Sequence, residues 1–349
     1  MTLSQFYNIL NLMKKLFTFF TLISFFTSCF NVRKDYTLLE IKEPISINGN
    51  FEEIEIGIPS QIEWINSNLY LFRVNGCAAK IFDENNKINI ADFGKMGPGP
   101  DEFISPFYAG YNKNNNRIYI NDISLKTFRE YEIIKKEDTL LFKKHITKNI
   151  KCDGIVFRAA VRLKNGYTVA QVISGTNKMF ILFDSDMKIH HTFESNPVGE
   201  DATVLHPFSG YLTSNENQFT FAAMYYGYIV SYNISDNGDV TKLWEHYLSC
   251  PYYETNRGRV KWDRERNKMG FFDVKMNDKH IYALYSGKKD IDDISRVPSN
   301  LLIFDLNGKL ENNYLLDKQS GRLTIAHDSI VYTIYTEPDV GIAKYKLWN

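Results

Sequence analysis

The chain has 349 residues, of which 41 are basic and 41 acidic, so its formal net charge is zero. That balance argues against a nucleic-acid-binding function, because nucleic-acid phosphates are bound by clustered lysine and arginine residues. The chain contains 22 tyrosines and 25 phenylalanines, and aromatic side chains are enriched in strands, so we predict a β-rich fold.

The start of the chain has the pattern of an export signal. Lys14 and Lys15 are followed by the apolar run 16–26 and then by small residues. The run is too short for a transmembrane helix, which needs about 20 apolar residues. Residues 1–28 are therefore predicted to be a signal peptide, and Met13 is a better initiator than Met1 because it places both lysines at the front of that signal.

Residues 26–29 have the sequence Phe-Thr-Ser-Cys, which resembles the bacterial lipobox, where the cysteine after the cleavage site receives lipid. Phe26 departs from the leucine that is usual at its position. We expect lipid attachment at Cys29, which would tether the protein to a membrane without a transmembrane helix. The alternative is a plain secretory signal in which Cys29 is incidental. Residues 29–50 are predicted to be the lipidated N-terminus and stalk, and residues 51–349 the folded domain.

Short apolar segments recur along the rest of the chain, and each follows a polar turn rich in Asn, Asp, Gly or Ser. Their starts are spaced by 49, 49, 52, 62 and 49 residues, and a period of this size is typical of propeller blades. We interpret them as the inner strands of six blades, at residues 69–72, 118–120, 167–170, 219–222, 281–284 and 330–333.

A strand–hairpin–strand unit recurs at residues 81–87, 182–188 and 303–309. Two longer polar stretches interrupt the repeat, at 257–268 and 288–300, and loops of that length are usually functional or mobile.

The last blade lacks a strand, because residues 343–348 fit its third strand and no sequence remains for a fourth. Residues 51–56 alternate as a strand ahead of the first blade. We predict that this segment completes the last blade and closes the ring, which protects the strand edges. The predicted fold class is thus all-β, a six-bladed β-propeller.

The segment FGKMGPGPDEF at 93–103 resembles the signature G-K-x-G-x-G-P-x-E-F of TolB-like six-bladed propeller lipoproteins of Bacteroidetes, and residues 281–287 resemble a second segment of that family. Pro98 and Pro100 remove two backbone donors, so the segment does not form a phosphate cradle. We expect a tight connection between the first two blades with Phe103 packed beneath it. The resemblance implies the fold and a cell-envelope location but no chemistry. Since no acidic run follows Cys29, we expect a periplasm-facing orientation, with surface exposure as the alternative.

No catalytic residue, metal ligand or cofactor site is predicted from the motifs. The seven histidines lack metal-ligand spacing, and Cys77, Cys152 and Cys250 form no CxxC pair, so the cysteines are interpreted as core residues.

Ligand-binding residues are expected on or just before the strands that line the channel, where arginine and tyrosine are the common binding side chains. The predicted function is non-catalytic binding of a peptide, glycan or protein partner by an envelope lipoprotein. The alternative is a metal-dependent hydrolase, lactonase or lyase whose ligands come from separate blades. The candidate ligand-binding residues are Arg158, His206, Tyr225, Tyr226, Tyr228, Tyr285 and Ser286.

Overall fold

The computed structural model describes residues 36–348, apart from residues 56, 86–87, 198–205, 257–258 and 292–296. The predicted signal peptide and Cys29 lie outside the described residues. The chain divides into two units, Met1–Thr37 and Leu38–Asn349, and every strand that the structure describes belongs to the second. Within the described part of the chain, no helix is long and apolar enough to cross a membrane.

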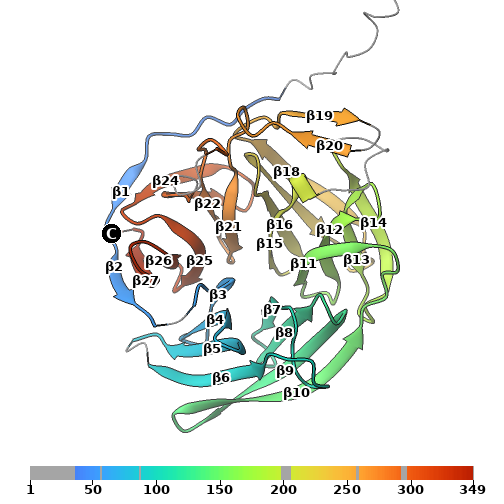
Figure 1. The fold of residues 1–349 in the computed structure, drawn as a ribbon, viewed down its shortest axis with the longest axis vertical. Helices are drawn as coiled ribbons and strands as arrows, with labels where there is room; N and C mark the ends of the chain where they lie inside the picture. The colour runs from blue at the N-terminus through green and yellow to red at the C-terminus, as the bar shows by residue number, and fades with distance from the viewer. Residues whose placement is uncertain are drawn as a thin grey trace, which may run out of the picture. The chain divides into compact units, whose positions relative to one another are not determined.

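The second unit is a ring of six blades, each built on four antiparallel strands (Figure 1). Blade one comprises β3 (Gln61–Ile65), β4 (Asn68–Val74), β5 (Cys77–Asp83) and β6 (Asn89–Lys95). Blade two comprises β7 (Pro106–Asn112), β8 (Arg117–Asp122), β9 (Thr127–Lys136) and β10 (Thr139–Asn149). Blade three comprises β11 (Val156–Arg162), β12 (Thr168–Ser174), β13 (Lys178–Phe183) and β14 (Ile189–Ser195). Blade four comprises β15 (Gly210–Asn215), β16 (Gln218–Ala223), β17 (Tyr228–Ile234) and β18 (Val240–Tyr247). Blades five and six contain β21 (Phe271–Met276), β22 (His280–Tyr285), β23 (Asn300–Asp305) and β24 (Leu310–Leu316), and β25 (Ser320–Ala326), β26 (Ile330–Tyr335) and β27 (Gly341–Lys346).

The N-terminal part of this unit adds one strand to each of two blades. Strand β2 (Asn50–Glu53) pairs antiparallel with β27 as the fourth strand of blade six, so the predicted closure of the ring is confirmed. Strand β1 (Ile45–Ile47) pairs in parallel with β24 and adds a fifth strand to blade five. Farther back, the Leu39 N–H donates to the Tyr247 carbonyl at the end of β18. Residues 38–50, assigned to the stalk in the sequence analysis, therefore run along the outer strands of the propeller.

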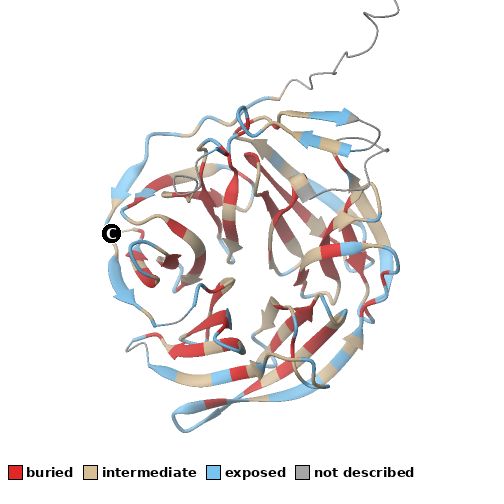
Figure 2. Ribbon diagram, viewed as in Figure 1, coloured by how far each residue is buried: buried red, intermediate tan, exposed pale blue. Residues whose placement is uncertain are grey.

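The apolar segments predicted to be the inner strands form the second strand of each blade instead. The innermost strands are β3, β7, β11, β15, β21 and β25, each next to the innermost strand of the following blade. Second strands have partners on both edges and neighbours on both faces, so they are almost wholly buried and have continuous apolar sequences (Figure 2). The innermost strands carry polar side chains that interrupt such a pattern.

Side chains on the innermost strands fasten successive blades to one another. Each accepts a hydrogen bond from a backbone N–H of the next blade in the ring, which fixes the relative height of the strands around the axis. The bonds run from Tyr108 N–H to Gln61 Oε1 (3.0 Å), from Met276 N–H to Thr213 Oγ1 (3.1 Å), from Leu323 N–H to Asp273 Oδ2 (3.0 Å) and from Trp64 N–H to Thr324 Oγ1 (2.8 Å).

The glycine-rich segment 93–103 is the tight connection expected between blades one and two. The Phe103 ring is only 1% exposed, and the Arg129 guanidinium carbon lies 4.5 Å from its centre. Gly94 has φ +62°, and a Cβ there would lie 2.5 Å from the Phe103 ring. Glu102 accepts a hydrogen bond from the Gly99 N–H and pairs with Lys95. The motif thus requires glycine because side chains of the same segment fill the space around it.

Candidate functional site

Polar and aromatic side chains from all six blades interact around the propeller axis. We call Glu63, Tyr108, Tyr211, Asp273, Lys275 and Arg322 the axial cluster; they belong to β3, β7, β15, β21 and β25. Arg158 on β11 supplies the remaining blade, because its guanidinium carbon lies 5.6 Å from the centre of the Tyr211 ring. Residues far apart in the sequence therefore meet at one place.

An ion pair between Glu63 and Lys275 lies at the centre of the cluster. The two side chains come from blades one and five, which are separated by blade six, so the pair reaches past a blade that contributes neither partner. Their side chains are 9% and 12% exposed, respectively. A charged pair this deeply buried is held where desolvation is costly, which makes its protonation state sensitive to its surroundings.

The pKa values of the pair follow from burial and from neighbouring charges. Burial raises the pKa of Glu63 to about 7, although Lys275 acts in the opposite direction. Burial alone lowers the pKa of Lys275, but the carboxylates of Glu63 and Asp273 outweigh it and raise the pKa. Lys275 thus stays charged at neutral pH, where Glu63 begins to take up a proton.

Arg322 is held mainly by backbone carbonyls. Its Nε donates to the Ser60 carbonyl at 2.5 Å, and Nη1 donates to the Phe272 carbonyl at 3.0 Å. The guanidinium carbon lies 5.2 Å from the centre of the Tyr211 ring. Among the described residues Arg322 forms no ion pair with a carboxylate, so its positive charge is oriented but not neutralised by a direct partner.

One end of the axis carries two further arginines, Arg73 and Arg158, which with Phe107 we call the channel mouth. Arg73 lies at the end of β4 that pairs with the start of β3, and its guanidinium carbon is 5.3 Å from the Phe107 ring centre. Arg73 has φ +58°, an uncommon conformation for a non-glycine residue. Neither arginine forms an ion pair or a side-chain hydrogen bond with any residue that the structure describes.

The charges of the axis favour an anionic ligand. Arg73, Arg158, Lys275 and Arg322 are positive, whereas Glu63 and Asp273 are the carboxylates among the residues named above. Asp273 is occupied by backbone donors, since its carboxylate accepts the N–H groups of Val274 and Leu323. Guanidinium groups beside aromatic rings bind carboxylate and phosphate groups through charge-assisted hydrogen bonds.

The same charges make the axis a poor metal site. Within the described residues, no three His, Cys, Asp or Glu side chains lie close enough together to hold a metal ion. Glu63 is paired with Lys275, and Asp273 binds backbone N–H groups. A divalent cation placed there would also be repelled by Lys275 and Arg322.

The predicted tyrosines of blade four lie apart from the axial cluster. Tyr225, Tyr226 and Tyr228 pack in an aromatic group that includes Trp262, beneath the inserted hairpin of β19 (Tyr253–Asn256) and β20 (Arg259–Trp262). Tyr226 is 1% exposed and stacks on Tyr228 with a ring distance of 5.8 Å, and Tyr228 donates to Glu245. These contacts place the three tyrosines in the packing between blade four and the hairpin.

The remaining predicted residues, Tyr285, Ser286 and His206, are not members of the axial cluster. Tyr285, at the end of β22, is buried against Phe271, and the Ser286 N–H donates to the Gly270 carbonyl. His206 begins the short 3₁₀ helix η1 (His206–Phe208), and its side chain lies outside what the structure describes. Burial raises the thiol pKa of the free cysteines Cys77, Cys152 and Cys250.

None of the six cluster residues was predicted from the sequence: Glu63, Tyr108, Tyr211, Asp273, Lys275 and Arg322. A usable signal was present, because each innermost strand directly precedes one of the recurring apolar segments. In β21, with the sequence FFDVKM, Asp273 and Lys275 stand two residues apart and therefore on the same side of the strand. Searching the strand ahead of each apolar segment for such charges would have pointed to the axis.

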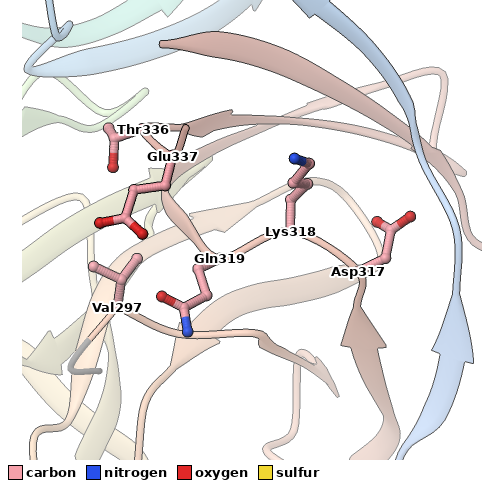
Figure 3. Close-up of a pocket in the computed structure, with 6 residues that line it drawn as sticks. All are labelled: Val297, Asp317, Lys318, Gln319, Thr336 and Glu337. Carbon is pink, nitrogen blue, oxygen red and sulfur yellow. The ribbon is translucent and has the colours of Figure 1, made fainter. Parts of the chain in front are cut away.

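Two surface hollows lie away from the axial cluster. One, of about 600 Å³, lies between turns of blades one and two and is lined by residues that include Tyr70, Ile88 and Leu140. The other, of about 200 Å³, is lined by Val297, Asp317, Lys318, Gln319, Thr336 and Glu337; in Figure 3, Gln319 and Glu337 lie near Val297, and Asp317 lies on the opposite side. Neither lining contains a member of the axial cluster or of the channel mouth.

Comparison with known proteins identifies the fold and its relatives. The profile of a family described as "TolB-like 6-blade propeller-like" matches residues 56–328. A candidate exported protein from Bacteroides fragilis has a TM-score of 0.58 and 12% identity, over 88% of this chain and all 100% of that one. A DUF4221 family member from Bacteroides vulgatus has a TM-score of 0.52 and 9% identity, over 86% of this chain and 99% of that one. No curated protein matches by sequence.

Proposed function

We propose, from the premise that the chain belongs to the TolB-like six-bladed propeller family, that it is a non-catalytic envelope protein that binds small anionic molecules at the channel mouth. The observation that carries the proposal is Arg158, which is partly exposed beside Tyr211 and has no carboxylate partner among the described residues. An arginine kept in place by an aromatic ring and free of a counterion is suited to a ligand carboxylate or phosphate.

The envelope location rests on the start of the chain. The signal pattern in residues 1–28 and the lipobox at Cys29 support export followed by lipid anchoring, and the related fold of a candidate exported protein from Bacteroides fragilis agrees with this. A lipid on Cys29 would hold the propeller at the membrane surface, facing the periplasm. Peptide, glycan or protein partners fit the proposed site where they present an acidic group.

A thermal-shift experiment on the purified protein tests the proposed site. Succinate, inorganic phosphate and neutral sugars are compared as probes, and we expect the anions alone to raise the melting temperature, because binding to the folded state stabilises it. The variant Arg158→Ala should lose most of that rise. Arg259→Ala, an exposed arginine of the inserted hairpin, serves as the matched control and should behave as the wild type. Equal shifts by anions and sugars, unchanged in Arg158→Ala, would contradict the proposal.

The alternative function is a metal-dependent hydrolase, lactonase or lyase with a site at the axis. The ion pair of Glu63 with Lys275 and the unpaired charge of Arg322 disfavour it. Metal analysis of the purified protein, combined with melting in the presence of a chelator, separates the two functions. We expect no stoichiometric metal and no chelator effect; a bound metal whose removal lowers the melting temperature would support the enzyme.

A further inference from the structure

The Glu63–Lys275 pair differs from the other polar contacts that join the blades. Asp273, Thr213, Thr324 and Gln61 each accept a backbone N–H of a neighbouring blade and so help to hold the ring together. The side chains of Glu63 and Lys275 form hydrogen bonds only with each other among the described residues. The pair is therefore not needed to satisfy any backbone group. Either side chain can be substituted without leaving a backbone N–H or carbonyl group unpaired.

Lys275 has capacity for a second acceptor. An ammonium group has three donors, and Glu63 is its one hydrogen-bond partner within the described chain. The side chain also keeps 12% exposure, so it is not sealed from solvent. A ligand carboxylate that reached this position could take the place of the Glu63 carboxylate without creating an unpaired buried charge on the lysine.

Contacts lead from the channel mouth to Arg322, and the charge of Arg322 acts on Lys275. Arg158 lies beside Tyr211, and the Tyr211 hydroxyl accepts a hydrogen bond from Arg322 Nη1 at 3.4 Å. Arg322 is in turn close enough to Lys275 for the two positive charges to repel each other. An anion that enters at Arg158 thus meets successive positive charges on its way to the lysine.

The groups that face Glu63 determine what happens when its charge is lost. Lys275 and Asp273 face it from β21, and Tyr108 faces it from β7, while Arg322 on β25 acts on Lys275. When Glu63 is neutral, the charges that remain are those of Lys275, Arg322 and Asp273. The centre of the axis then carries a net positive charge, and Lys275 has lost its competing internal carboxylate.

We propose that Lys275 is an inner binding group for carboxylate-bearing anions and that Glu63 is an internal competitor, which leaves Lys275 when it takes up a proton. The proposal rests on the proposed function, because it assigns a second contact to the same bound anion. Binding of the anion is coupled to uptake of one proton by Glu63. With a Glu63 pKa of about 7, the apparent affinity should rise by about tenfold between pH 8 and pH 6.

Isothermal titration calorimetry of the full protein with succinate, and separately with inorganic phosphate, tests the coupling. Titrations at pH 6, 7 and 8 in buffers of different ionisation enthalpy measure both the affinity and the number of protons taken up. For succinate we expect the tenfold rise and an uptake that approaches one proton at pH 8. A preference for phosphate at every pH would overturn the carboxylate assignment.

The variants separate the two side chains. Glu63→Gln should bind succinate with the low-pH affinity at every pH, and Lys275→Met should bind it at least tenfold more weakly. The double variant Glu63→Gln/Lys275→Met removes both buried charges together, so it leaves no unpaired charge in the interior. If its circular dichroism matches the wild type, its loss of binding does not reflect misfolding. Glu216→Gln, which alters a glutamate exposed at the surface and paired with Lys164, is the matched control and should keep the wild-type pH dependence.

The outcomes distinguish this inference from the proposed function. Absence of succinate and phosphate binding by the wild type at all pH values would contradict the proposed function and the inference together. Binding that needs Arg158 but is the same at pH 6 and pH 8, or the same in Glu63→Gln and wild type, would overturn the inference alone. Carboxyl ¹³C NMR of Glu63 gives a readout without ligand: a titration midpoint near 7 supports the competitor role, and a midpoint near 4.5 contradicts it.

Discussion

Glu63 is a buried carboxylate with one partner, and this makes the stability of the protein depend on pH. Its pKa is about 7 in the folded protein, against an ordinary value of 4.5. Between those values the folded protein binds more protons than the unfolded chain, so the free energy of unfolding falls as pH rises.

Urea unfolding at pH 5 and pH 8 measures this effect as a difference between the wild type and Glu63→Gln. We expect the wild type to lose on the order of 2 kcal/mol more than the variant on going from pH 5 to pH 8, because only the wild type carries the titrating group. Equal losses in the two proteins would show that Glu63 titrates with an ordinary pKa.

The individual residues of the site were only partly predictable from the sequence. Arg158 was selected because ligand-binding groups are expected on or just before the strands that line the channel, where arginine is a common binding side chain. Glu63 and Lys275 were not selected, because they lie 212 positions apart in the sequence and meet only after the ring has closed. Tyr226 was selected as a ligand-binding residue, but its neighbours Trp262 and Phe208 place it in the core, and the insertion that brings Trp262 there has no sequence repeat.

The glycine-rich connection between β6 and β7 is the element whose sequence and geometry match most closely. At Gly94, a left-handed backbone conformation coincides with a close approach of the Phe103 ring. Gly154 has a similar φ of +75°, and a methyl group added there would meet no atom within 4 Å, so it isolates the cost of the backbone conformation.

Chemical denaturation of Gly94→Ala and Gly154→Ala tests this interpretation of the connection. Gly154→Ala should cost about 1 kcal/mol, which is the conformational penalty alone. Gly94→Ala should cost roughly 2 to 4 kcal/mol, because the new methyl group also displaces Phe103. Equal losses in the two variants would mean that Phe103 yields easily and that the motif does not depend on the packing described above.

The number of blades was predictable from the sequence, but the order of the strands within each blade was not. The second strand of each blade is buried on both faces, and its continuous apolar sequence revealed the repeat. The innermost strands were not predicted, because residues such as Asp273 and Arg322 face the axis and interrupt the apolar pattern by which a buried strand is recognised. Strand β1 was not predicted for another reason. It has only three residues, which pair in parallel with the edge of β24 and are too few to show a strand periodicity.

At the scale of the molecule, closure of the ring links the fold to the site. Strand β2 completes blade six and keeps β25 beside β3, and that junction brings Arg322 to the Ser60 carbonyl. The closing strand was predictable because blade six lacked a strand and residues 51–56 alternated ahead of blade one. Which side chains meet at the axis was not predictable, because this depends on the relative height of six strands.

Binding of an anion at the axis can be measured by NMR of the arginine Nε–Hε groups during a succinate titration. The signals of Arg158 and Arg322 should shift along one saturable curve, while the signal of Arg259 on the inserted hairpin stays unchanged. Saturable binding that leaves the Arg158 and Arg322 signals in place, with shifts confined to residues such as Tyr70 around the hollow between blades one and two, would show that the anion does not bind at the axis.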